Sequence, residues 1–288
     1  MLQHVYFTNH NERLLGAYHR PEEAATTLPL GIVMLHGWAG YRIGAHQMFT
    51  KLGRRAEAEG FHCLRFDFRG RGDSEGDAAS ATLTTMISDA LAAVDWLTAN
   101  AGVRRVALVG DCSGAEVAIG AGVLREAVTD MVLWSAPMVG ADRAAADRAK
   151  KADIIRQYVA KLFRARTYAK LFGGRLDLRT IGRALKSGGK GAGEQGSEED
   201  AEIDWLWRFV DFPGRVLFVY GGNDPTAPEA MRHYEALSRR AGREFRCHLV
   251  QGANHAFYSV QWENEVMDAT VEWLLEQAGR PTATGAGS

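Results

Sequence analysis

The sequence has few cysteines and no long hydrophobic run. Its 288 residues include three cysteines, Cys63, Cys112 and Cys247. They are too few and too scattered for a disulfide framework or a zinc site, and spare thiols fit a reducing compartment. No apolar run approaches the roughly 18 residues that a membrane span needs, and the polar N-terminal stretch contains no signal-peptide core. We therefore expect a cytoplasmic protein without a transmembrane segment, a metal site or an organic cofactor.

Neither sign of charge dominates, and proline is scarce. The chain carries 34 Lys and Arg against 35 Asp and Glu, for a formal net charge of −1, and 46% of its residues are hydrophobic. It contains 32 glycines but only 7 prolines, which suits many tight turns rather than a disordered polymer. This composition excludes collagen-like, coiled-coil and disordered chains, and it predicts a globular protein of enzyme size.

The charge is unevenly distributed along the chain. Residues 141–190 contain fourteen Lys and Arg but only four Asp, so this segment carries +10 and the remainder −11. It leads into a glycine-rich and then acidic stretch at 187–202, which is typical of a flexible linker. We expect a core domain at 1–137 and 206–278, a basic helical cap at 138–205 and a disordered tail at 279–288.

Outside the basic segment, short runs rich in Val, Ile and Leu alternate with longer segments of helical periodicity. The runs predict buried strands at 30–35, 61–66, 103–109, 130–134, 214–220 and 245–250. A hairpin of strands at 3–8 and 13–19 precedes them. The periodic segments predict helices at about 45–59, 80–99, 113–125, 227–241 and 259–277. This alternation predicts an α/β fold with a mainly parallel sheet, whose chemistry lies at the carboxyl ends of the strands.

A turn with two flanking glycines follows the run at 103–109. It reads GDCSG at 110–114, the G-x-nucleophile-x-G pattern in which glycines let the backbone crowd around a strained residue. Cys112 then stands at a helix N-terminus, where the positive end of the helix dipole favours a thiolate. Ser113 is the alternative nucleophile, but that register puts an aspartate and an alanine where glycine is needed. Cys112 is the favoured nucleophile, and the elbow glycines are Gly110 and Gly114.

Two further candidate groups follow later strands. The run at 214–220 is followed by GGNDPTAP, which places Asp224 in a turn before a helix. The run at 245–250 is followed by QGANHAFYS, which places His255 in the same way. A cysteine, an aspartate and a histidine thus follow three strands in the order nucleophile, acid and base. We expect Cys112, Asp224 and His255 to form a catalytic triad.

These motifs resemble those of the α/β-hydrolase superfamily, in its monoacylglycerol-lipase and serine-aminopeptidase-like branch. The likeness rests on LHGWAG at 35–40, DFRGRGDSEG at 67–76, the elbow and the turns around Asp224 and His255. YRIGAHQMF, LRFDFRGRGDSEG and GDCSGAE are also similar to the hydrolases associated with the exosortase A system, which carry a cysteine at the elbow. The first loop departs from that group, because it reads HGWAGYR rather than GGPQYR. The resemblance implies an α/β-hydrolase fold with an eight-stranded sheet and an inserted helical cap.

The resemblance also implies an oxyanion hole. In such hydrolases the loop after the first long strand supplies one backbone N–H, and the residue after the nucleophile supplies the other. We assign these donors to Trp38 and Ser113, while His36 and Gly37 shape the loop. The loop at 67–76 is expected to brace the floor of the site through local hydrogen bonds.

The pattern predicts a hydrolase that cleaves an ester or thioester through an acyl-cysteine intermediate. Two alternatives stay open: an acyltransferase that passes the acyl group to an alcohol or amine, and a catalytically silent binding scaffold. The charge of the cap favours an anionic or carrier-bound acyl substrate, or anionic lipid at a membrane surface, unless it only solvates the outer face of the cap. No nucleic-acid recognition motif accompanies that charge, so nucleic acid is not an expected partner.

Overall fold

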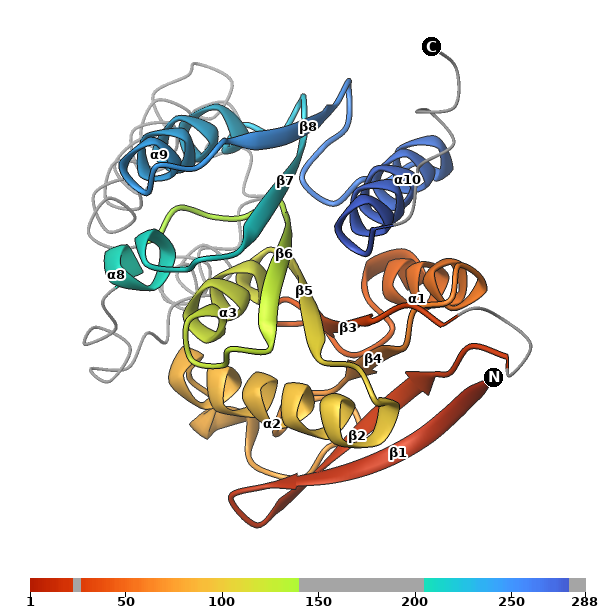
Figure 1. The fold of residues 1–288 in the computed structure, drawn as a ribbon. Helices are drawn as coiled ribbons and strands as arrows, with labels where there is room; N and C mark the ends of the chain where they lie inside the picture. Colours follow the sequence, from red (N-terminus) through yellow and green to blue (C-terminus); the bar gives the residue numbers. More distant parts are fainter. Residues whose placement is uncertain (23–26, 140–204, 280–288) are drawn as a thin grey trace, which may run out of the picture. The chain divides into compact units, whose positions relative to one another are not determined.

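One eight-stranded sheet organises the part of the chain that the structure describes. The computed structural model describes residues 1–22, 27–139 and 205–279. Its strands lie in the order β1-β2-β4-β3-β5-β6-β7-β8 (Figure 1). Their bounds are β1 Leu2–Asn9, β2 Glu12–His19, β3 Leu30–Leu35, β4 Cys63–Phe66, β5 Arg105–Asp111, β6 Val128–Trp134, β7 Arg215–Gly221 and β8 Arg246–Val250. The β1–β2 and β2–β4 pairs are antiparallel and the other pairs are parallel, which confirms the predicted sheet.

Helices cover both faces of this sheet. Helices α1 (Met48–Ala58) and α10 (Val260–Gln277) pack together on one face (Figure 1). The other face carries α2 (Leu83–Ala101), α3 (Ser113–Gly122), α8 (Trp205–Val210) and α9 (Ala227–Arg240), each in contact with the next. Two short 3-10 turns, Ala45–Gln47 and Ala78–Ser80, lie in the loops before α1 and α2.

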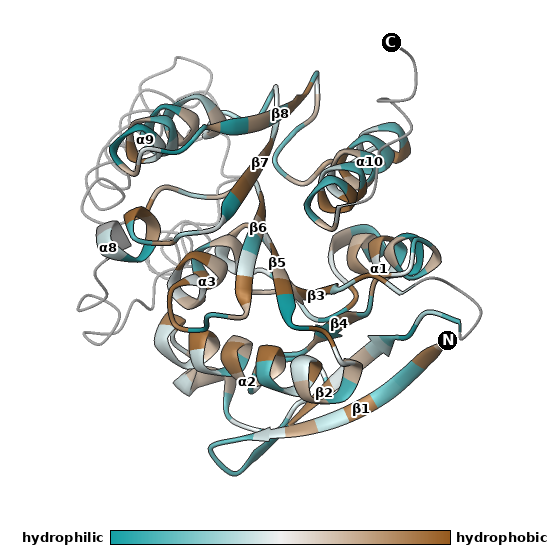
Figure 2. Cartoon of the chain, in the orientation of Figure 1, coloured by the Kyte–Doolittle hydropathy of each residue, from teal (hydrophilic) through white to brown (hydrophobic). Residues whose placement is uncertain are grey.

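The central strands are buried on both faces, which explains their continuous apolar runs. All six residues of β3 are buried, and successive side chains point to opposite faces. Ile32 and Met34 join the core with Phe49 of α1, whereas a Cβ at Gly31 would meet the Leu97 side chain of α2. Figure 2 shows hydrophobic residues concentrated on the central strands, while α9 and the tip of the β1–β2 hairpin are largely hydrophilic. Full burial of one such side chain contributes roughly 2 kcal/mol.

The element boundaries differ from the expected ones where pairing between strands decides them. The strand expected at 103–109 becomes β5 and runs on to Asp111, because Asp111 still pairs with Trp134 of β6. Helix α8 was not predicted, since six residues are too short to show a helical period. The expected cap and linker fall at 140–204, and the expected tail at 280–288, outside the described residues. Within the described residues, no helix is both long and apolar enough to cross a membrane.

Candidate active site

The turn between β5 and α3 holds Cys112 in a strained backbone conformation. Cys112 has φ 53° and ψ −119°, a region that side chains rarely occupy, and it immediately precedes the first turn of α3. A Cβ at Gly110 would collide with the backbone of Gly114, and a Cβ at Gly114 would collide with the carbonyl of Leu35. Both glycines are therefore required by close backbone approach. The strain turns the Cys112 side chain out of the strand at its carboxyl end.

Asp224 and His255 meet beyond the ends of β7 and β8. The Nδ1–H of His255 donates to Asp224 Oδ2 at 2.7 Å. The other carboxylate oxygen accepts from the backbone N–H of Thr226 at 2.9 Å and from its hydroxyl at 2.8 Å. Asp224 is only 2% exposed, and burial by itself would raise the pKa of its carboxyl group. The hydrogen bonds from His255 and Thr226 outweigh burial and hold that pKa below its ordinary value.

His255 joins the carboxylate to the cysteine. The hydrogen bond to Asp224 and a second one to the Cys112 side chain raise the pKa of His255 to about 10, although burial opposes the rise. The Ser135 hydroxyl donates to the backbone carbonyl of His255 at 2.8 Å and ties the histidine loop to the end of β6. The structure thus brings Cys112, Asp224 and His255 into one hydrogen-bonded chain. Because His255 contacts the cysteine side chain, the geometry favours Cys112 over Ser113 as the nucleophile.

The loop after β3 lies directly against the elbow. A Cβ at Gly37 would stand 3.6 Å from the Cβ of Cys112 and 3.6 Å from Ser113 Oγ. The backbone N–H of Trp38 donates to Ser113 Oγ at 2.6 Å. The two residues assigned to the oxyanion hole are therefore adjacent, but the Trp38 N–H already has an acceptor in this structure.

His36 shapes this loop as a neutral side chain. The Phe68 N–H donates to His36 Nε2 at 3.3 Å, so the ring proton is on Nδ1, which donates to Gly37 O at 2.8 Å. His36 is 1% exposed, and burial lowers its pKa to about 4. A group that stays uncharged and has partners on both nitrogens positions the loop and takes no proton from a substrate.

The loop at 67–76 contacts the segment that follows β3 and supports the site. The carboxylate of Asp67 accepts from the backbone N–H groups of Arg42 at 2.6 Å and Asp73 at 3.0 Å, and it also forms an ion pair with the Arg42 guanidinium. The guanidinium of Arg71 lies 5.4 Å from the centre of the Trp38 ring. These contacts link the loop to the segment that carries the Trp38 N–H, as the sequence motif predicts.

Comparison with known proteins identifies the family that has this architecture. The model of the alpha/beta hydrolase family matches residues 32–270. The chain belongs to the alpha/beta hydrolase family. The superfamily expected from the motifs is confirmed, whereas membership of the exosortase-associated subgroup with a cysteine nucleophile stays a prediction.

Curated relatives of this hydrolase match a shorter segment. Human protein ABHD12B is 38% identical over 109 residues, which cover 37% of this chain and 29% of that protein. The lysophosphatidylserine lipase ABHD12 of Xenopus tropicalis is 37% identical over 97 residues, which cover 34% of this chain and 24% of the relative. The chain therefore spans less than a third of the length of these relatives.

Solved structures match nearly the whole hydrolase. The Pyrococcus furiosus esterase PF2001 has a TM-score of 0.67 and 20% sequence identity, over 97% of this chain and 91% of that chain. Est1E from Butyrivibrio proteoclasticus with bound ferulic acid has a TM-score of 0.64 and 18% identity, over 96% of this chain and 100% of that chain. At such identities the likeness shows the shared fold alone.

The three cysteines of the hydrolase stand in different environments. Cys63 is fully buried in β4, and burial raises the pKa of its thiol well above the ordinary value. Burial also raises the pKa of Cys247 in β8 to about 11. Cys112 is partly exposed and has a histidine as its hydrogen-bond partner. Because the thiolate is the reactive form, Cys112 is the cysteine best placed to react.

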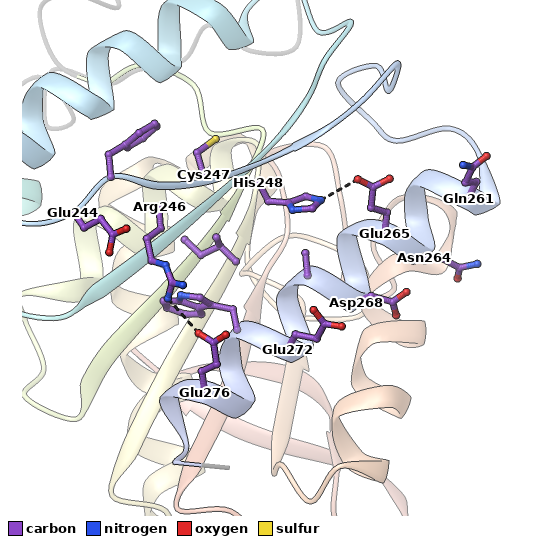
Figure 3. A pocket seen from close by; sticks show the side chains of 14 residues that line it. Glu244, Arg246, Cys247, His248, Gln261, Asn264, Glu265, Asp268, Glu272 and Glu276 are labelled. Carbon is purple, nitrogen blue, oxygen red and sulfur yellow. Dashed lines mark hydrogen bonds and ion pairs between the residues drawn. The ribbon is translucent and has the colours of Figure 1, made fainter. Parts of the chain in front are cut away.

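A groove of about 730 Å³ lies away from this site, between β8 and α10 (Figure 3). Its charged lining is mainly acidic, and His248 points across it to Glu265 of α10 at 3.0 Å. Cys247 points to the opposite side of the strand in Figure 3. Neither Cys112, Asp224 nor His255 lines this groove, so it is not the place where their chemistry would occur.

Sequence reasoning missed three residues near the centre. Thr226 was detectable, because a threonine two residues after an aspartate at a helix start is a common turn motif. Ser135 carried no local signal, since its partner is 120 residues away. In the sequence, Asp111 shows only that the alternative register of the elbow lacks a glycine there. Burial raises the pKa of Asp111 to about 6 against the opposing charge of His255, so a second carboxyl group titrates beside Cys112.

Proposed function

We propose that this hydrolase cleaves an ester or thioester through Cys112, His255 and Asp224, with a covalent acyl-cysteine intermediate. The observation that carries the proposal is the chain of hydrogen bonds from Asp224 through His255 to a cysteine at a strained elbow. With a pKa of about 10, His255 holds a proton at neutral pH. In the proposed mechanism this proton comes from the Cys112 thiol. Cys112 would then react as a thiolate paired with imidazolium.

In the acylation step the Cys112 sulfur attacks the carbonyl carbon, and the carbonyl electrons move to oxygen as an oxyanion. Collapse of this tetrahedral species breaks the bond to the leaving group, which takes its proton from His255. Neutral His255 next removes a proton from water, and the resulting hydroxide attacks the thioester. The second collapse expels the Cys112 thiolate and releases the acid, and His255 keeps the proton that it took from water, so the thiolate–imidazolium pair is restored. Asp224 holds the imidazole in one orientation throughout.

The substrate class to test first is a carboxylic ester of an anionic lipid. Relatives named lysophosphatidylserine lipases align with about a third of this chain. The segment at 141–190 carries an excess of ten positive charges. Opposite charge raises the local concentration of an anionic substrate. Carrier-bound acyl thioesters are the second class. The proposal of an anionic lipid substrate also includes contact of the basic cap with an anionic membrane surface. The proposal includes a cytoplasmic, reducing location, which would keep Cys112 unoxidised.

The test is intact-protein mass spectrometry of the wild type and Cys112→Ala after brief exposure to p-nitrophenyl esters, lysophospholipids and acyl-CoAs. We expect an acyl adduct on the wild type only, with steady product release. Iodoacetamide at neutral pH should label Cys112 and leave Cys247 unlabelled. Product release by Cys112→Ala at the wild-type rate would contradict the proposal. Repeating the assay with an added alcohol or amine tests the acyl-transfer alternative.

A further inference from the structure

The Trp38 N–H does not point into an empty oxyanion hole. It donates to Ser113 Oγ at 2.6 Å, a short distance for a bond between a backbone amide and a hydroxyl. An oxyanion hole stabilises the transition state only through donors that are aimed at the developing charge. The serine side chain therefore either moves aside when a substrate binds or takes part in the hole itself.

The peptide that carries the Trp38 N–H is anchored. Its carbonyl, Gly37 O, accepts from the Gly40 N–H at 2.8 Å and from His36 Nδ1 at 2.8 Å. A peptide unit is planar, so two bonds to its oxygen also fix the direction of its N–H. His36 is buried and has partners on both ring nitrogens. The loop donor is thus built to keep facing Ser113.

The Ser113 hydroxyl has a proton to give. A serine hydroxyl offers one donor and two acceptor positions, and the Trp38 N–H occupies one acceptor position. Within residues 1–22, 27–139 and 205–279, no acceptor is found for the hydroxyl proton. Ser113 is partly exposed, and its Oγ and the Cβ of Cys112 both lie 3.6 Å from the position that a Cβ at Gly37 would occupy, so the hydroxyl lies close to the cysteine. A hydroxyl that accepts a hydrogen bond is also a better donor, because the two bonds polarise one another.

We propose that the Ser113 hydroxyl is itself an oxyanion-hole donor, which passes the polarising effect of the Trp38 N–H to the substrate oxygen. The hole then consists of the Ser113 hydroxyl and the Ser113 backbone N–H. This inference rests on the proposed function, since it needs a carbonyl that is attacked by Cys112. The alternative is a serine that swings aside and leaves the Trp38 N–H to bind the oxyanion directly. The two arrangements predict opposite effects of removing the hydroxyl.

The experiment compares two reactions of Cys112 in the wild type, Ser113→Ala and Ser113→Thr. Acylation is followed as the burst of p-nitrophenol from a p-nitrophenyl ester, and alkylation as the rate of labelling by iodoacetamide. Only acylation passes through an oxyanion. Loss of one donor lowers such rates by about 10²–10³-fold, and the Trp38 N–H freed in Ser113→Ala should recover part of that loss. We expect Ser113→Ala to acylate about 10–100-fold more slowly while its alkylation rate stays within about twofold of the wild type.

Ser113→Thr keeps the hydroxyl, and we expect its acylation rate to exceed that of Ser113→Ala by about tenfold or more. Acylation of Ser113→Ala as fast as the wild type, or faster, would overturn the inference and leave the proposed function intact. Equal slowing of acylation and alkylation in Ser113→Ala would also overturn it, because the hydroxyl would then act on the thiolate. A wild type that forms no adduct on Cys112 would overturn both the proposed function and the inference.

Discussion

The two halves of the candidate site are held in different ways. The elbow half comprises Gly110, Cys112 and Gly114, which lie within five residues of one another and are positioned by backbone crowding. The acid–base half comprises Asp224 and His255, which are 31 residues apart and are positioned by side-chain hydrogen bonds. Any side chain at the elbow glycines would clash with the backbone, whereas the hydrogen bonds of the other half can be removed one at a time. A single substitution in the elbow should therefore cause a large loss of stability, whereas substitutions around Asp224 and His255 should lower activity by graded amounts.

The largest expected effect is the loss of the carboxylate that orients His255. We expect Asp224→Asn to lower kcat by about 10³-fold, because the imidazole loses both its fixed orientation and the charge that favours imidazolium. Steady-state kinetics with the best ester from the substrate panel measures this effect. Asp95→Asn, which removes an exposed carboxylate paired with Arg125, serves as the control and should stay within about twofold of the wild type. An Asp224→Asn enzyme with more than a tenth of the wild-type kcat would contradict the assigned role.

Gly114→Ala should destabilise the protein strongly, because it adds a side chain at the crowded elbow. The added Cβ would overlap the Leu35 carbonyl, so we expect a loss of about 3 kcal/mol or more in the free energy of unfolding. Gly102→Ala is the control, because a Cβ at Gly102 would meet nothing within 4 Å, so the only cost is that of its positive φ of 69°. It should cost only about 1 kcal/mol. Urea unfolding followed by circular dichroism separates the two, and equal losses would refute the steric explanation.

The pH dependence of acylation should separate the roles of His255. Its raised pKa means that the protonated form is present at neutral pH and is lost as the pH rises through about 10. For an alkyl ester, whose leaving group needs that proton, we expect kcat/KM to fall along this limb. A p-nitrophenyl ester leaves as an anion and should show a much weaker decline. Identical alkaline limbs for the two substrates would argue against His255 as the proton donor.

The smallest expected effect concerns the support of Asp224. Thr226→Val removes the hydroxyl donor to Asp224 Oδ1 but keeps the backbone N–H that bonds to the same oxygen. We expect kcat to fall by about two- to fivefold, in line with the loss of one hydrogen bond of about 1 kcal/mol. Thr226→Ser retains the hydroxyl and should restore the wild-type rate. A loss of kcat as large as that of Asp224→Asn would mean that activity does not fall by graded amounts when hydrogen bonds are removed from this half of the site.

Much of the fold could be predicted because its signals are local. Apolar runs predict the central strands, and GDCSG predicts the turn at Cys112 without any knowledge of long-range contacts. The apolar run predicts a strand from residue 61, whereas β4 begins at Cys63, where pairing with Ile32 of β3 starts. Helix α8 is too short to show a helical period, and the hydrogen bond from Ser135 to the His255 carbonyl joins residues 120 apart, so neither has a local signal in the sequence. Such features depend on which segments pack together.

The sequence by itself determined the α/β alternation, the order of cysteine, aspartate and histidine, and the glycines of the elbow. These follow from residue size and periodicity, which act over a few neighbouring residues. Only the tertiary structure decided that the Trp38 N–H meets Ser113 Oγ, 75 residues away, and that Thr226 and Ser135 hydrogen-bond to Asp224 and His255. A hydrogen bond between distant segments requires both to be positioned by the packed sheet, and neither segment carries that information alone.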